Sequence, residues 1–340
     1  MEKLERQFES AFPSEKWATV PTLVAVSGGA DSVSCLRVMA SLGGRFPDWN
    51  SSNLIVGHIN HGTRGAQSDL DSEFVSQLTQ RLGLKYLEAK CSDSGLAGAS
   101  EESLRNFRYS QLLELGQSCG ARYLVMGHNF DDQVETILFR IFRGTGISGL
   151  AGIPRQRLAS EAITIVRPLL ESTREQIIDY LNQISQTYCV DSSNADSTYT
   201  RNYLRNDVLP NLKVRFGDAI SDSIVRLGSQ AKEINTFLDS MMGDCATAMT
   251  RQEESKIELN CDQLRAYSPL VVRHWLSRVW IEQNWPRQSM TFQWWKKICD
   301  SIQQPPDTVL NLPCSIRFEK TGSTAVFLDL RPSGGRSNGQ

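Results

Sequence analysis

Three features that would place this chain in a specialised class are missing from its sequence. None of its eight cysteines forms a C-x-x-C pair, which excludes the spacings typical of zinc ribbons, iron–sulfur sites and thioredoxin-type redox centres. No apolar run is long enough for a transmembrane helix. The net charge is −2, so the overall basic balance of many nucleic-acid-binding proteins is also absent. We therefore expect the cysteines to be free thiols that pack as small apolar residues.

The remaining composition is that of an ordinary globular protein. The 340 residues, 40% hydrophobic and 22% charged, suffice for about two domains without a stabilising disulfide or metal. The first ten residues, MEKLERQFES, contain no apolar stretch of the kind that signal peptides have. We therefore expect a cytoplasmic protein that does not associate with membranes.

The first half of the chain alternates between strand and helix patterns. Short apolar, β-branched runs predict buried strands at 22–27, 53–60, 84–90 and 122–128. Apolar residues at helical spacing predict helices over 31–42, 69–82, 101–119 and 130–143. This alternation predicts an α/β fold with a doubly wound parallel sheet, in which ligands bind beyond the carboxyl ends of the strands.

The pattern is less regular after residue 152. It predicts an edge strand at 162–170, a helix at 173–185, a helical stretch that continues to about residue 250, and short strands at 308–312, 315–318 and 325–329. We place a domain boundary between residues 216 and 217. The expected units are residues 1–216, a smaller and mainly helical domain at 217–330, and a disordered tail at 331–340.

A glycine-rich loop joins the first strand to the first helix, and its residues are Ser27, Gly28, Gly29, Ala30, Asp31 and Ser32. Paired glycines let the main chain approach a ligand, and successive N–H groups at a helix N-terminus form an anion site. Asp31 suits a phosphate site only if a cation such as Mg²⁺ bridges it to the phosphate. The loop has no lysine and is not a Walker A motif. A plain left-handed turn is the alternative interpretation.

The loop resembles the pyrophosphate loop, S-G-G-x-D-S, of the N-type ATP pyrophosphatases, the PP-loop superfamily, whose fold is adenine nucleotide alpha hydrolase-like. Members of that superfamily cleave ATP to AMP and pyrophosphate and usually adenylate a substrate oxygen. The resemblance implies that the six loop residues bind ATP and that Asp31 contacts Mg²⁺. It does not identify the substrate.

Four further segments resemble one family of that superfamily, the tRNA(Ile)-lysidine synthetases. They are HINHGTR at 58–64, in which Thr63 replaces the usual Leu, GHNFDDQVET at 127–136, RGTG at 143–146 with GLAGI at 149–153, and DSSN at 191–194 with RN and LR at 201–205. The resemblance covers roughly residues 20–215 in order, and the chain resembles the shorter form of the family.

The resemblance implies a ligase reaction on RNA. ATP would adenylate the C2 oxygen of the wobble cytidine in the CAU anticodon of tRNA(Ile), and free L-lysine would displace AMP to give lysidine. Codon specificity then changes from AUG to AUA, and amino acid specificity changes from methionine to isoleucine. The region 217–330 would bind the tRNA by shape and charge. The oligomeric state is left open, with a homodimer among the alternatives.

The acidic residues of the second segment are candidates for the chemistry. Asp131, Asp132 and Glu135 stand at the start of a predicted helix, where Asp131 and Glu135 share a face. The lysine amine must be neutral to attack, so it needs a base or an acidic pocket. We expect Asp31, Asp131 and Asp132 to be catalytic, Asp31 and Asp132 to hold the metal, and Glu135 to bind substrate. Capping of the helix is the alternative for these acids.

Histidines and arginines complete the predicted site. His58 and His61 follow a strand and are expected near the nucleotide, as is His128; a structural role is the alternative. Arginine forks suit phosphate, so Arg143 and Arg201 are expected to bind substrate and Arg205 to act in catalysis; surface ion pairing is the alternative. Of the adjacent Trp294 and Trp295, we expect at least one to pack in a core.

Three other functions remain as alternatives. A tRNA thiolase of the same superfamily would need catalytic cysteines, often in the C-x-x-C pairs that are missing here. A glutamine-fed amide synthetase would need an amidotransferase domain, for which the chain upstream of residue 22 is too short, or a separate partner. A non-catalytic nucleotide-binding module would not need Asp31 and the acids at 131–135.

Overall fold

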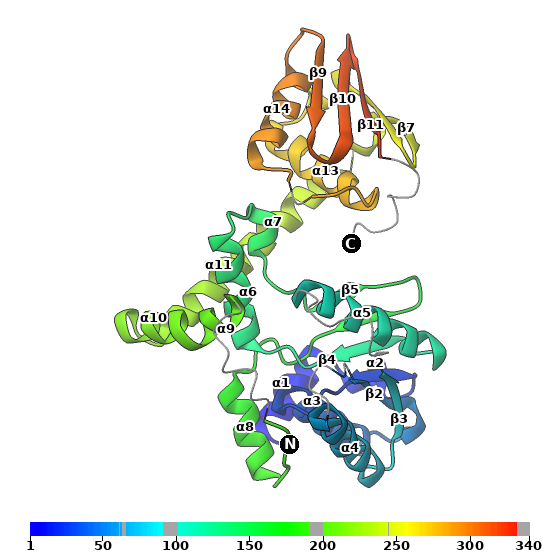
Figure 1. Ribbon diagram of the computed structural model, residues 1–340, viewed down its shortest axis with the longest axis vertical. Coiled ribbons are helices and arrows are strands. Elements are labelled where there is room, and N and C mark those ends of the chain that lie inside the picture. Colours follow the sequence, from blue (N-terminus) through cyan, green and yellow to red (C-terminus); the bar gives the residue numbers. More distant parts are fainter. Residues whose placement is uncertain are drawn as a thin grey trace. The chain divides into compact units, whose positions relative to one another are not determined.

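The computed structural model describes residues 1–60, 62, 66–90, 101–190, 200–243, 245–287 and 289–331. The chain forms two compact units (Figure 1): Met1–Gly144 with Gly152–Gly228, and Thr145–Ala151 with Ser229–Gln340. The units therefore divide at Gly228, inside helix α11 (Ala219–Met241), rather than at the 216/217 position expected from the sequence. The assignment of separate functions to two domains stays a prediction.

The first unit is built on a six-stranded sheet in the order β3-β2-β1-β4-β6-β5. Its strands are β1 (Thr22–Ala25), β2 (Leu54–Asn60), β3 (Lys85–Lys90), β4 (Tyr123–Met126), β5 (Gln156–Leu158) and β6 (Thr164–Val166). All neighbours are parallel except β5, which pairs antiparallel with β6. The predicted α/β fold with a doubly wound parallel sheet is confirmed.

The predicted edge strand at 162–170 forms β6 but does not lie at the edge. The edge is β5, whose three residues are exposed and polar except for Leu158. A short exposed strand of this kind has no apolar alternation, so it cannot be predicted from hydrophobic periodicity.

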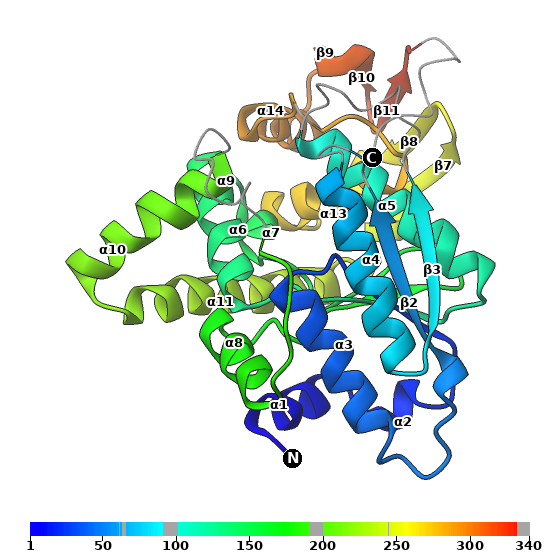
Figure 2. The same ribbon diagram turned by 60° about the horizontal axis from the view of Figure 1, so that its bottom comes forward.

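Helices cover both faces of this sheet (Figure 2). They are α1 (Lys3–Ala11), α2 (Ser14–Trp17), α3 (Ala30–Gly43), α4 (Ala66–Arg81), α5 (Glu101–Ser118) and α8 (Arg174–Gln183). Helix α6 (Phe130–Phe142) follows β4 and contacts residues 204–208. Consecutive strand residues point to opposite faces. Val24 and Val125 pack with α1, α3, α4 and α8, whereas Leu23 and Leu124 pack with α5. All five helices predicted between residues 31 and 185 are present, within a few residues of the expected ends.

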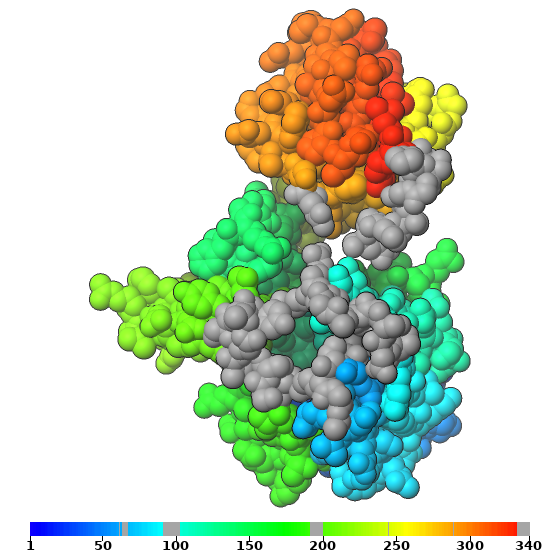
Figure 3. Space-filling model, viewed as in Figure 1, coloured from blue at the N-terminus to red at the C-terminus, as the bar shows by residue number. Residues whose placement is uncertain are grey.

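The rest of the first unit is helical. It contains α9 (Thr200–Tyr203), a π-helical turn (Leu204–Val208), α10 (Leu209–Phe216) and the start of α11. Helix α10 lies at the surface (Figure 3), where Val214 and Phe216 are exposed. Gly217 ends it with a positive φ of 81°.

The second unit combines helices with a five-stranded antiparallel sheet in the order β7-β8-β11-β10-β9. The strands are β7 (Met249–Glu253), β8 (Lys256–Asn260), β9 (Thr308–Leu312), β10 (Ile316–Thr321) and β11 (Thr324–Asp329), and the helices are α7 (Ile147–Leu150), α12 (Cys261–Leu264), α13 (Pro269–Glu282) and α14 (Phe292–Gln303). The three predicted strands are present. The helix expected to continue to residue 250 ends at Met241, and β7 and β8 follow it.

An aromatic core holds the second unit together. Trp280, Trp285, Phe318 and Phe327 are buried, and Trp295 packs edge-on against Trp280 with ring centroids 5.3 Å apart. The expectation that at least one of the two adjacent tryptophans packs in a core is confirmed. The tail expected to be disordered falls outside the described residues, except for Arg331. Among the described helices, none is long and apolar enough to cross a membrane.

Candidate functional site

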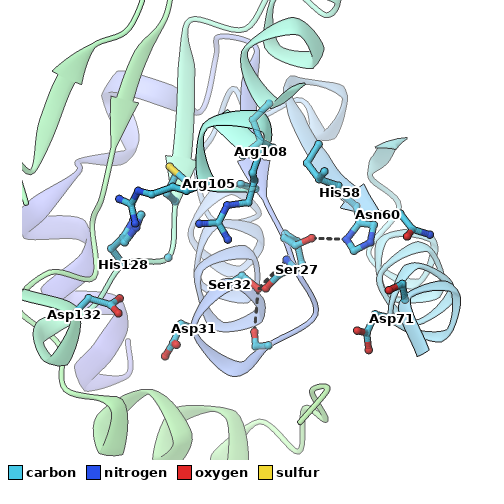
Figure 4. Close-up of a pocket in the computed structure, with 18 of the residues that line it drawn as sticks. Ser27, Asp31, Ser32, His58, Asn60, Asp71, Arg105, Arg108, His128 and Asp132 are labelled. Atoms are coloured by element: carbon cyan, nitrogen blue, oxygen red, sulfur yellow. Dashed lines mark hydrogen bonds between the residues drawn. The ribbon is translucent and has the colours of Figure 1, made fainter. Parts of the chain in front are cut away.

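A cavity of about 400 Å³ opens at the carboxyl ends of β1, β2 and β4 (Figure 4). β1 and β4 are neighbours in the sheet but are connected to strands on opposite sides, which is the switch point where ligands bind in open α/β sheets. The cavity is lined by the glycine-rich loop, the end of β2, helix α5 and the start of α6. All of these elements belong to the first unit.

The loop between β1 and α3 is held open by its own serines. Ser32 Oγ accepts a hydrogen bond from Ser27 N at 3.1 Å and donates one to Gly29 O at 3.0 Å. Gly28 has a φ of +95°, and a Cβ there would lie 3.1 Å from Cys189 Sγ. Gly29 is the N-cap of α3, so the first amide groups of a 14-residue helix face the cavity without intrahelical partners. The loop therefore has the geometry of an anion-binding site.

A second glycine brings β4 against the first turn of α3. A Cβ at Gly127 would lie 2.7 Å from the carbonyl oxygen of Asp31, so no larger residue fits. This approach places Asn129 beside Asp31, and its Nδ2 donates to Asp31 Oδ1 at 3.0 Å. Asn129 also caps α6 reciprocally, because its Oδ1 accepts from Asp132 N and its own N donates to Asp132 Oδ2, both at 3.0 Å. The two helix starts and their carboxylates are thus joined through one amide.

Asp31 and Asp132 both line the cavity. Asp31 Oδ2 accepts a hydrogen bond from Arg174 Nη1 at 2.8 Å. Burial raises the pKa of Asp31 and the charge of Asp132 acts in the same direction, while Arg174 opposes both. Burial thus disfavours the charged form of the Asp31 carboxylate, and a cation beside it stabilises that form.

Arg205 binds two acidic residues of α6, Glu135 and Asp132. It projects from the π-helical turn, and its Nε and Nη2 donate to Glu135 Oε1 at 2.5 Å and Oε2 at 3.1 Å. Nη2 also lies 3.3 Å from Asp132 Oδ1. Glu135 is only 2% exposed, and burial raises its pKa to about 6 although Arg205 acts the other way. Glu135 therefore orients Arg205 rather than facing the cavity, whose lining does not include it.

Positive charge gathers on the opposite wall of the cavity. Arg105 and Arg108 lie one turn apart on α5 and line it together with Arg201 and His128 (Figure 4). Burial and the neighbouring arginines hold the pKa of His128 well below its usual range, so its ring is neutral. Within the described part of the chain, Arg108 Nε and His128 Nδ1 are buried without a hydrogen-bond partner. Buried polar atoms left unpaired beside several cations indicate a site for an anionic ligand.

His58 is the polar group at the end of β2. Its Nδ1 lies 2.8 Å from the carbonyl oxygen of Val26, and burial lowers the pKa of the ring. A neutral imidazole that donates from Nδ1 leaves Nε2 as an acceptor. Asn60, the next inward residue of β2, is fixed through Asp69 Oδ1 at 3.0 Å and lines the same cavity.

Eight of the residues expected from the sequence meet in this cavity: Ser27, Gly29, Asp31, Ser32, His58, His128, Asp132 and Arg201. Ala30 and Arg205 line a second cavity of about 320 Å³, together with Arg174, and this cavity shares Ser27, Gly29, Asp31 and Asp71 with the first. His61 and the segment 191–194 lie outside the described residues.

The remaining expected residues lie elsewhere. Asp131 Oδ2 accepts a hydrogen bond from the backbone N of Arg174 at 2.9 Å, so it docks the start of α8 onto the start of α6. Arg143 follows the last residue of α6, roughly 18 Å along the helix from its first turn. Its guanidinium is exposed and covers the Phe139 ring at 4.2 Å. Neither residue lines the two cavities described above.

Sequence reasoning missed Arg105, Arg108 and Arg174. For Arg105 and Arg108 the available signal was the spacing R-N-F-R in a helix that follows the third strand, because residues three apart share a helix face. Charged residues on a polar helix usually form a solvated surface, so this spacing alone carried little information.

Comparison with known proteins agrees with this geometry. The family described as "PP-loop domain" matches residues 1–212. A "tRNA(Ile)-lysidine synthase" of Rhodopirellula baltica is 30% identical over 335 residues, which cover 88% of this chain and 84% of that protein. The chain belongs to the tRNA(Ile)-lysidine synthase family. A second member, from Bacteroides thetaiotaomicron, is 34% identical over 71% of this chain, which spans only 54% of that relative's length.

The fold is also found in another tRNA-modifying enzyme. The "U34-tRNA thiolase NcsA from Methanococcus maripaludis" superposes with a TM-score of 0.55 at 17% identity, over 68% of this chain and 78% of that one. This likeness concerns the fold alone.

Within the lysidine synthase family motif at 127–136, Gln133 pairs its side-chain amide with the backbone N and O of Ile153 at 2.7 and 2.8 Å. Ile153 is thereby held against α6.

Proposed function

We propose that this chain ligates lysine to C2 of the wobble cytidine in the CAU anticodon of tRNA(Ile). ATP first adenylates the C2 oxygen and releases pyrophosphate. The lysine ε-amine then forms the C–N bond, and AMP leaves with the oxygen. The change converts codon specificity from AUG to AUA and amino acid specificity from methionine to isoleucine. The observation that carries the proposal is the cavity in which the PP-loop, two carboxylates and three arginines meet.

The cavity suits ATP in two parts. The adenosine would lie near the end of β2, where Ile59 and Met126 offer apolar surface and His58 and Asn60 offer hydrogen bonds. The phosphates would lie against the amide groups of the loop and the N-terminus of α3, where a negative charge is stabilised.

Asp31 and Asp132 are the side chains that would hold Mg²⁺. In the described part of the chain no group of three or more His, Cys, Asp or Glu side chains is arranged for a metal. Two carboxylates beside a phosphate loop nevertheless fit Mg²⁺, which commonly takes one or two protein carboxylates and completes its shell with water and phosphate oxygens. The bound ion would supply positive charge to the phosphates.

Arg105, Arg108 and Arg201 would stabilise the charge that develops when the α-phosphate is attacked. They are already in place, so no reorganisation is needed when the bond breaks. Arg201 Nη2 donates to Thr136 Oγ1 at 3.1 Å, which fixes its position on α6. Asp132, held between Asn129 and Arg205, is the carboxylate of α6 that faces the cavity and can meet the ammonium group of lysine.

The RNA is proposed to enter as a single-stranded loop, because a wobble base is accessible only when it is unstacked. Exposed Arg143 is a candidate contact to the tRNA backbone, and the second unit is the candidate for the remaining contacts. Every group named in the chemistry comes from one chain, so the proposal holds for a monomer and for a homodimer.

The test is lysine-dependent release of pyrophosphate from ATP in the presence of tRNA(Ile) with a CAU anticodon. Mass spectrometry of the anticodon fragment should show the lysine adduct on one cytidine. A tRNA(Met) with the same anticodon is the control substrate and should stay unmodified. Modification that depends on a sulfide donor or on ammonia instead of lysine would contradict the proposal, as would a full rate in Asp132→Asn.

A further inference from the structure

Arg174 binds the carboxylate that the proposed metal needs. Its Nη1 lies 2.8 Å from Asp31 Oδ2, while Asn129 Nδ2 occupies the other oxygen, Oδ1, at 3.0 Å. Both oxygens of Asp31 thus have a side-chain donor. A metal ion that binds this carboxylate therefore competes with these two donors for its oxygens.

The two donors differ in how firmly they are held. Asn129 is 1% exposed, and its Oδ1 is already bound to the backbone of Asp132. The side chain of Arg174 is 42% exposed, and Asp31 is its side-chain partner among the described residues. Arg174 is therefore the donor that can leave.

The position of Arg174 is maintained by its backbone and not by its side chain. Arg174 N donates to Asp131 Oδ2 at 2.9 Å, and Phe130 N donates to Ser172 O at 2.9 Å. These bonds dock the start of α8 onto the start of α6. Arg174 is the first residue of α8, where a positive charge is unfavourable for the helix. The positive charge at this position is therefore explained by the contact of Arg174 with Asp31 and not by any stabilisation of α8.

The second cavity offers space into which the guanidinium of Arg174 can turn. It is lined by Ser27, Gly29 and Ala30 of the phosphate loop, and by Arg174 and Arg205. A guanidinium that leaves Asp31 therefore remains next to the loop amides, where the terminal phosphates of ATP are proposed to lie.

We propose that Arg174 is an exchangeable positioning residue, which pairs with Asp31 until the metal–nucleotide complex arrives and then turns to the terminal phosphates. The inference rests on the proposed function. It predicts opposite effects of one substitution, because removal of the guanidinium frees Asp31 for the metal but takes a cation away from the departing pyrophosphate.

The first experiment measures binding in the absence of tRNA and lysine. Binding of a fluorescent ATP analogue is titrated with Mg²⁺ at pH 8 for wild type, Arg174→Gln, Arg174→Lys and Arg45→Gln. The half-saturating Mg²⁺ concentration should fall about fivefold in Arg174→Gln, the size expected for loss of one competing ion pair. Arg174→Lys should lie within about twofold of wild type because it keeps the charge.

Arg45→Gln is the matched control. Arg45 pairs with Glu5 at 2.9 Å in the same unit, and its side chain is 50% exposed, close to that of Arg174. It lines neither cavity. Its substitution should leave the Mg²⁺ midpoint unchanged.

The second experiment measures pyrophosphate release with tRNA and lysine at saturating Mg²⁺ and ATP. Arg174→Gln should be about tenfold slower than Arg45→Gln, the order expected for one charge-assisted hydrogen bond. A merely structural role would weaken Mg²⁺ binding and turnover together. An unchanged or higher Mg²⁺ midpoint in Arg174→Gln overturns the inference, as does a rate equal to that of Arg45→Gln. If wild type releases no pyrophosphate, the proposed function fails, and the Mg²⁺ midpoint alone decides on the exchange.

Discussion

The cavity wall formed by α5 carries two arginines, Arg105 and Arg108. Arg108 Nε and His128 Nδ1 have no partner among the described residues, and Arg105, Arg108, Arg167 and Arg201 all act on the pKa of His128 in the same direction. A buried cation without an anionic or hydrogen-bonding partner destabilises a fold. Such cations are found where a bound ligand supplies the partner. A substitution in this wall should therefore lower the activity without lowering the stability of the fold.

Arg108→Met tests that separation. Methionine retains much of the arginine stem and removes the buried charge, so the melting temperature should stay equal or rise. Pyrophosphate release should fall about 100-fold, because one preorganised donor to the phosphate is lost. Arg81→Met, at an exposed position on α4, is the control and should change neither quantity. A melting temperature several degrees lower with activity retained would contradict this interpretation.

Glu135 predicts a pH dependence of stability. Its pKa is raised from 4.5 to about 6, so between these values the folded protein binds more protons than the unfolded chain. The stabilisation is therefore complete below pH 4.5 and is lost as pH rises through 6. Relative to Glu135→Gln, which does not titrate, the unfolding free energy of wild type should fall by about 2 kcal/mol over this range. Urea denaturation of both proteins from pH 4.5 to 7.5 measures it, and a constant difference would contradict the assignment.

Sequence reasoning located part of this site and missed the rest for a definite reason. The loop at 27–32, Asp132 and Arg201 belong to local motifs, which can be recognised from the sequence alone. Arg105, Arg108 and Arg174 acquire meaning only from what lies opposite them in space. The same limit explains Asp131, which was expected to be catalytic because of its motif, yet in the structure it contacts the start of α8.

The elements around the site are positioned by close backbone approach. The end of β4 meets the first turn of α3 at Gly127, and the starts of α6 and α8 meet through Phe130, Asp131 and Arg174. Three helix N-termini are thereby joined next to the loop. Their positive ends face the same region, which favours an anionic ligand there.

Gly127→Ala should disrupt this arrangement. A Cβ would lie 2.7 Å from Asp31 O and 3.0 Å from Ser32 N, and backbone atoms cannot move aside as a side-chain tip can. We expect a loss of about 2–3 kcal/mol in unfolding free energy, together with loss of MgATP binding. Gly243→Ala is the control, since its added Cβ would have no neighbour within 4 Å. Equal stability of the two variants in denaturant titrations would show that the close approach is not required.

Elements with strong apolar periodicity could be predicted, and polar elements could not. β1, β2 and β4 are apolar runs buried on both faces, so their pattern identifies them without tertiary information. β5 and β7 consist mostly of exposed polar residues, and they form because a neighbouring strand offers unpaired backbone groups. That kind of pairing is a property of the sheet and leaves no periodicity in the sequence.

At the scale of the whole molecule, both cavities of the proposed site belong to one compact unit. Every side chain that lines the two cavities lies within Met1–Gly144 or Gly152–Gly228, and the second unit has its own aromatic core and sheet. Nucleotide binding and stability of the second unit should therefore be separable. This separation is the physical basis for proposing a distinct, RNA-directed role for the second unit.

Hydrogen exchange tests the separation directly. A ligand that binds only the folded site raises the free energy of every opening that destroys the site, by about 2.7 kcal/mol at 100 times its Kd. The amides exposed by those openings then exchange more slowly. MgATP should therefore raise amide protection in β1, α3, α5, α6 and the start of α8, whose residues surround the cavities. Amides of β8, β10 and β11 should exchange at the same rate with and without nucleotide. The control is Asp31→Asn, in which the nucleotide should protect neither set. Equal protection of the antiparallel sheet in wild type would mean that the two units open together, and the nucleotide site could no longer be treated as a property of the first unit alone.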